Sequence, residues 1–129
     1  MNPVRRATLM GLAAAALAGA PLGAQAAPSF DCKRASSIVE KEICGVPELG
    51  DLDSNVAAAF TQAIAALSPA DADALRADER AWLKDRDNCG DLIHGDPPIM
   101  ADVYVCLKDQ MSARVTRLKA ILARKQYFK

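Results

Sequence analysis

The side chains of this 129-residue chain that could do chemistry include four cysteines and a single histidine. The cysteines are Cys32, Cys44, Cys89 and Cys106. An even number of cysteines behind an N-terminal export signal favours disulfide bonds. Three pairings are possible, and we favour Cys32 with Cys44 and Cys89 with Cys106, because each pair brackets a local turn between helix-forming segments. The chain has no CxxC pair and one histidine, so we expect no metal site and no other cofactor.

Charged side chains form a second group, in the stretch over residues 75–89, which follows helical spacing. At 100° per residue, one face of such a helix carries Leu75, Glu79, Trp82, Leu83, Arg86 and Cys89. Charges on an apolar face are costly unless they are paired, so this helix needs complementary groups on other helices. Asp53 and Arg114 lie on the apolar faces of two other predicted helices. We predict a buried charge network of Asp53, Glu79, Arg86 and Arg114, in which arginine forks bind carboxylates.

The geometry of this network bears on its role. Glu79 and Arg86 are separated by about 10 Å along a helix, so each should pair across helices rather than with the other. The network either fixes the helix register or lies partly at an open end and meets a ligand. Trp82, the only tryptophan, is predicted to be a core anchor, and a hot spot for partner binding is the alternative.

The elements that must position these side chains are helices. Apolar residues at helical spacing, with caps at Ser36 or Ser37 and at Ser68, predict a short helix over residues 38–43 and longer ones over 47–67, 69–88 and 97–125. No alternating polar and apolar run indicates a strand. The predicted fold class is all-α: a small disulfide-stapled helical bundle of three longer helices plus one short N-terminal helix.

The N-terminal residues 1–26 have the plan of an export signal. Arg5 and Arg6 precede an apolar run, and Ala24 and Ala26 offer small residues for cleavage after Ala26. The apolar run is shorter than the ~20 residues of a membrane span, so an uncleaved anchor is the less favoured alternative. We expect one periplasmic or secreted domain over residues 27–129 with no membrane span after cleavage.

The charge of this predicted domain argues against nucleic-acid binding. Loss of Arg5 and Arg6 leaves 14 basic and 16 acidic residues, a net charge of −2.

His94 lies in a glycine-flanked loop, and no pattern places a nucleophile beside it. Phosphate-binding glycine loops and zinc signatures are also missing. We therefore predict a binding or inhibitory module rather than an enzyme.

Both halves of the chain resemble the LprI family of bacterial envelope proteins. The first half contributes Phe30-Asp31-Cys32, Val39-Glu40-Lys41, Ile43-Cys44, Pro47-Glu48-Leu49 and Leu52-Asp53. The second half contributes Arg80-Ala81-Trp82-Leu83, Arg86-Asp87, Cys89, Cys106-Leu107, Arg114-Val115 and Leu118. Two features depart from the pattern: Glu79 stands where relatives usually carry Gln, and residues 92–96 look like an insertion.

The resemblance implies a helical envelope domain that inhibits lysozyme by protein–protein binding. The target would be a cationic enzyme with two carboxylates in its cleft. An acidic surface could attract it, formed by Asp71, Asp73, Asp78, Asp85, Asp87 and Asp91, or a loop over residues 90–98 could enter the cleft. The candidate partner-binding residues are Asp85, Asp87, Asp91, His94 and Asp96. The alternatives are a module that binds another envelope or secreted protein, and an enzyme acting on peptidoglycan.

Overall fold

The structure is a computed structural model that describes residues 27–93 and 99–128. Its elements in chain order are a 3₁₀ helix η1 (Cys32–Arg34), α1 (Ile38–Gly45), α2 (Pro47–Ala66), α3 (Pro69–Asp87), a 3₁₀ helix η2 (Asn88–Leu92) and α4 (Ala101–Arg124). Disulfides join Cys32 to Cys44 and Cys89 to Cys106, with Cα–Cα distances of 5.8 and 5.7 Å. The all-α fold class and the favoured cysteine pairing are confirmed.

Helix α1 begins at a reciprocal cap. The Ser37 hydroxyl accepts a hydrogen bond from the Glu40 N–H at 3.1 Å, and the Glu40 carboxylate accepts one from the Ser37 N–H at 3.0 Å. This arrangement satisfies backbone donors that a helix start leaves free. The helix runs two residues beyond the predicted end at Ile43, because the disulfide of Cys44 holds its last turn in place.

Helices α2 and α3 follow their predicted limits to within one residue. Pro47 and Pro69 occupy their first turns, where a missing N–H costs nothing. The Ser68 hydroxyl accepts from the Asp71 N–H at 3.3 Å and starts α3 directly after α2 ends. This short connection makes the two helices antiparallel neighbours.

The predicted start of α4 at residue 97 is wrong. Residues 97 and 98 lie outside the described part of the chain, but Ile99 and Met100 are described and are not helical. The first helical bond runs from the Tyr104 N–H to the Met100 carbonyl at 3.0 Å. Proline suits a loop as well as a first helical turn, so Pro97 and Pro98 did not define the start. The helix ends at Arg124, because the next residue, Lys125, has a left-handed φ of 51°.

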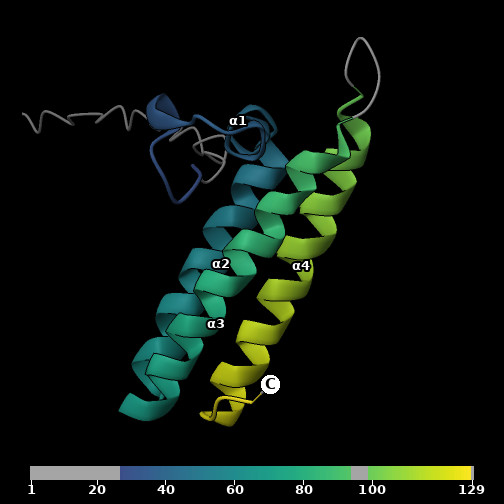
Figure 1. Ribbon diagram of the computed structural model, residues 1–129. Helices are drawn as coiled ribbons and strands as arrows, with labels where there is room; N and C mark the ends of the chain where they lie inside the picture. Colours follow the sequence, from purple (N-terminus) through teal and green to yellow (C-terminus); the bar gives the residue numbers. More distant parts are fainter. Residues whose placement is uncertain (1–26, 94–98, 129) are drawn as a thin grey trace, which may run out of the picture.

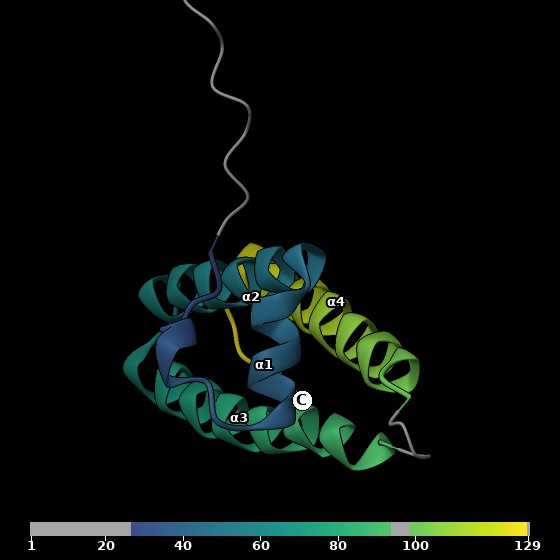
Figure 2. The same cartoon turned by 90° about the horizontal axis from the view of Figure 1, so that it is seen from above.

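The three long helices lie side by side, and α1 crosses one end of them (Figure 1). Viewed from above, α1 occupies the space between α2 and α3 (Figure 2). Helix α2 makes its most extensive contact with α4. The largest fully buried side chains come mainly from these helices: Ile43, Leu49, Leu75, Leu107, Met111, Leu118 and Ile121. Within the described residues, we find no helix with the length and apolar character needed to cross a membrane.

Candidate functional site

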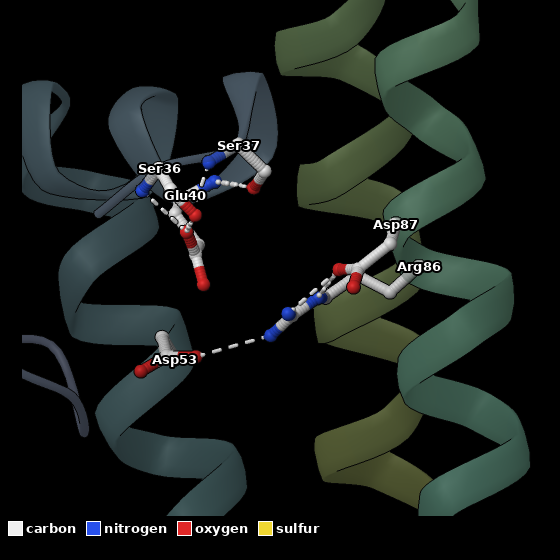
Figure 3. Close-up of polar contacts among 6 residues, drawn as sticks. All are labelled: Ser36, Ser37, Glu40, Asp53, Arg86 and Asp87. Carbon is white, nitrogen blue, oxygen red and sulfur yellow. Dashed lines mark hydrogen bonds and ion pairs between the residues drawn. The ribbon is translucent and has the colours of Figure 1, made fainter. Parts of the chain in front are cut away.

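The predicted charge network forms two clusters, and the first joins α2 to α3. Arg86 extends from α3 toward Asp53 on α2 (Figure 3), and its Nη1 lies 3.4 Å from Asp53 Oδ1. Its Nε and Nη2 donate to Asp87 Oδ1 at 3.0 and 2.7 Å. The other Asp53 oxygen accepts from the Ser29 N–H at 2.6 Å. Asp53 and Arg86 are both buried, so their pairing compensates for charges removed from water.

The second cluster joins α3 to α4 through Arg114. Its Nε and Nη2 both donate to Glu79 Oε2, the former at 2.9 Å, and its Nη1 donates to Asp78 Oδ2 at 2.7 Å. The guanidinium thus uses both edges of its fork. Arg117 lies 3.8 Å from the same Asp78 carboxylate. Glu79 and Arg86 each pair across helices.

The network contains more acid than the sequence analysis predicted. Asp78 and Asp87, assigned there to an acidic surface, contact Arg114 and Arg86, so that four carboxylates surround two arginines. Asp78 is next to Glu79 in the sequence and Asp87 is next to Arg86, and this position was the available signal. An arginine that binds one carboxylate still has N–H donors for a second one. The predicted charge network of four residues was therefore incomplete.

The environment of Glu79 has two opposing effects on its ionisation. Burial raises the pKa of the Glu79 carboxyl above its ordinary value, while the hydrogen bonds and charge of Arg114 oppose that rise. The nearby Asp78 carboxylate raises the pKa further. Arg114 is thus the group that keeps a carboxylate tolerable at this position.

Trp82 lies beside both clusters. The guanidinium carbons of Arg86 and Arg114 are 5.8 and 5.3 Å from the centroid of its ring, within range of cation–π attraction. The indole is only partly buried, and it packs against the hydrophobic core. Leu83, predicted on the same inward face, is 36% exposed, so that expectation is wrong. It lies 100° around the helix from Trp82 and lines the pocket described below.

A pocket of about 400 Å³ opens beside these residues, between α2 and α3. Its lining combines three carboxylates and one arginine with aromatic and aliphatic side chains: Ser29, Phe30, Glu40, Asp53, Val56, Ala57, Phe60, Glu79, Trp82, Leu83 and Arg86. Pockets that bind ligands have this character, mostly apolar with a few placed polar groups. The predicted network thus lies partly at a solvent-accessible opening.

One wall of the pocket comes from the segment over residues 27–37, called the N-terminal segment below. It is held to α2 by the hydrogen bond from Ser29 to Asp53 and by one from the Ser54 hydroxyl to the Ala27 carbonyl. The disulfide of Cys32 ties it to α1. Ser29 and Phe30 therefore reach the pocket through tertiary contacts rather than through helix periodicity.

Glu40 lies at the junction of this segment with α1, and its pKa leads to a pH prediction. Hydrogen bonds from the Ser37 and Ser36 N–H groups lower the pKa of Glu40 below its ordinary 4.5. The native state then releases this proton more readily than the unfolded state, so the stabilisation is present above the ordinary value and is lost as pH falls through the native pKa. We expect Glu40→Gln to lower stability at neutral pH and the difference from wild type to shrink on acidification. Urea unfolding at a series of pH values measures this, and a constant difference would contradict it.

Those candidate partner-binding residues that the structure describes are not part of this pocket. Asp85, Asp87 and Asp91 are exposed on α3 and η2, and none lines the pocket. His94 and Asp96 lie outside the described residues. Of the wider acidic surface, Asp73 pairs with Arg76 and Asp71 accepts from the Tyr127 N–H. In the described part of the chain, no three His, Cys, Asp or Glu side chains converge as metal ligands.

These features define a small, disulfide-linked, all-helical domain with one face opened by a charged pocket. A family model described as "Lysozyme inhibitor LprI" matches residues 32–118, which is more than half of the chain and includes all four cysteines. The chain belongs to the LprI family, whose description names an inhibitor rather than an enzyme. Comparison with curated proteins and with solved structures found no match.

Proposed function

We propose that this protein is an exported inhibitor of lysozyme that acts by binding the enzyme. The observation that carries the proposal is the family match over residues 32–118. It covers the N-terminal segment from Cys32 onward, both disulfides and both arginine clusters, and so nearly all of the described fold.

Export is a second part of the proposal. The basic start, apolar run and small residues of 1–26 support cleavage after Ala26 and release into the periplasm or beyond the cell. Two disulfides support the same assignment, because such bonds persist in oxidising compartments. Mass spectrometry of the protein recovered from a periplasmic fraction would identify the N-terminal residue.

The proposed activity predicts a measurable slowing of cell-wall lysis. Purified protein without residues 1–26, added to lysozyme and a cell-wall suspension, should reduce the lysis rate, and more strongly at low salt, because its net charge of −2 favours a cationic enzyme. The turbidity decrease over time measures the rate. The reduced and alkylated protein is the control, since it lacks both the cross-link that holds the N-terminal segment and the one that joins η2 to α4. Unchanged lysis at a large molar excess would overturn the proposal.

A further inference from the structure

The pocket between α2 and α3 has an apolar body. Phe30 comes from the N-terminal segment, Phe60 from α2, and Trp82 and Leu83 from α3. These side chains belong to three different parts of the chain, so the opening is created by the fold. Its volume of about 400 Å³ lies within the range of roughly 300 to 1,000 Å³ typical of ligand pockets.

The charges around this apolar body are unequal. Glu40, Asp53 and Glu79 line the pocket, and Arg86 is the one basic side chain among the lining residues. The Arg86 guanidinium is already shared between Asp53 and Asp87, and both Asp53 oxygens accept hydrogen bonds. The positive charge of Arg86 is therefore compensated within the protein, and so is the negative charge of Glu79, by Arg114. Glu40 forms no ion pair among the described residues, so the excess charge at the pocket is negative.

One carboxylate oxygen of Glu40 and one of Glu79 can still accept a hydrogen bond from a ligand. The hydrogen bonds to Glu40 from Ser36 and Ser37 all reach Oε2. Those from Arg114 to Glu79 likewise reach Oε2. No described residue donates to Oε1 of either side chain. In Figure 3 the Glu40 carboxylate points from α1 toward the space between Asp53 and Arg86.

This arrangement selects an organic cation rather than a metal ion. A metal would need several convergent ligands, and no such group is present among the described residues. Carboxylates at the edge of an apolar floor instead match a side chain with a hydrocarbon stem and a charged head. Lysine and arginine have this form, and their heads donate several hydrogen bonds.

We infer that the pocket receives a lysine or arginine side chain projecting from a basic protein partner, with its stem against Phe60, Trp82 and Leu83 and its head between Glu40 and Glu79. The inference rests on the proposed function for the identity of the partner, lysozyme. The interaction is an anchor within a larger contact, a role that arginine commonly has in protein interfaces.

The test uses two pairs of matched variants and measures lysozyme binding by surface interferometry at neutral pH. Glu40→Gln removes a pocket charge and keeps an acceptor for the cap of α1, and Glu42→Gln removes the same charge from the same helix outside the pocket. Leu83→Ala shortens the pocket wall, and Val105→Ala is its control, since Val105 is an aliphatic side chain that is 53% exposed on α4 and does not line the pocket. We expect each pocket variant to weaken binding by about five- to tenfold. The controls should change it less than about twofold.

A second measurement does not depend on lysozyme. The single tryptophan lines the pocket, so its fluorescence reports occupancy. Titration with the N-acetyl, N-methylamide derivatives of arginine and lysine should change the Trp82 emission of the wild-type protein. The citrulline derivative, which has a similar shape without the charge, should change it much less. Glu40→Gln should reduce the response to the two cationic probes.

The two measurements separate this inference from the proposed function. Lysozyme binding that is equal for wild type and both pocket variants would overturn the pocket assignment and leave lysozyme inhibition standing. A wild-type protein that does not bind lysozyme, but whose Trp82 responds to the cationic probes and not to citrulline, would support the pocket and overturn lysozyme as the partner. Equal responses to arginine and citrulline probes would overturn the charge-based argument.

Discussion

Replacing Arg114 with methionine is expected to lower the free energy of unfolding by about 3 to 5 kcal/mol, the cost of leaving a buried charge without its partner. The Arg114 side chain is 3% exposed, and among the described residues it alone forms an ion pair with Glu79. Methionine would fill a similar volume but could not donate hydrogen bonds to the Glu79 and Asp78 carboxylates. Burial and the Asp78 carboxylate, which both raise the pKa of Glu79, would then be opposed only by the charge of Arg86.

Urea unfolding followed by far-ultraviolet circular dichroism measures this loss. Arg76→Met is the matched control, because Arg76 forms an ion pair with Asp73 while its side chain is 48% exposed. Such surface pairs contribute roughly 0 to 1 kcal/mol. Adding Asp78→Asn and Glu79→Gln to Arg114→Met should recover part of the stability, since it removes the uncompensated charges. A loss below about 1 kcal/mol for Arg114→Met would contradict the assignment of a buried structural network.

Removing the Cys89–Cys106 bridge by paired alanine substitutions should lower the free energy of unfolding by roughly 3 kcal/mol through chain entropy alone. The bridge closes a separation of 17 residues and joins η2 to the first turns of α4. Cys89 is buried in the core, so lost packing adds to this effect. The helices themselves should survive in the variant.

The paired substitution of Cys32 and Cys44 is the comparison. Its separation of 12 residues gives a nearly equal entropy term, but Cys32 is exposed. We therefore expect the Cys89–Cys106 variant to be the less stable of the two in chemical unfolding, under conditions where the remaining disulfide stays oxidised. Equal losses would mean that the buried sulfur of Cys89 adds no packing stabilisation.

Much of the architecture could be predicted from residue spacing. Proline and serine at helix starts fixed the limits of α2 and α3, because their backbone requirements are local. The prediction that Glu79 and Arg86 each pair with a residue of another helix followed from the cost of unpaired buried charge and from the distance between the two along α3. The start of α4 did not follow, because Pro97 and Pro98 are compatible with more than one backbone path.

The pocket could not be predicted in the same way. Ser29 and Phe30 have no periodic pattern, and their positions depend on hydrogen bonds to α2 and on a disulfide to α1. The exposure of Leu83 depends on which side of α3 is left uncovered, and spacing along one helix does not determine this. The sequence identified four members of the charge network from their residue types and spacing. The further acids, Asp78 and Asp87, became evident only from the ion pairs that the two arginines form in the structure.

Both sulfur bridges involve elements at the end of the bundle where α1 lies, while the Ser68 connection and the C-terminus of α4 lie at the other end (Figure 1). Covalent restraint is therefore distributed asymmetrically along the long axis. The end near Ser68 is held by non-covalent contacts alone, so we expect partial opening that leaves the bridges intact to start there. The pocket wall formed by the N-terminal segment lies at the cross-linked end, and we expect such fraying to leave its shape unchanged.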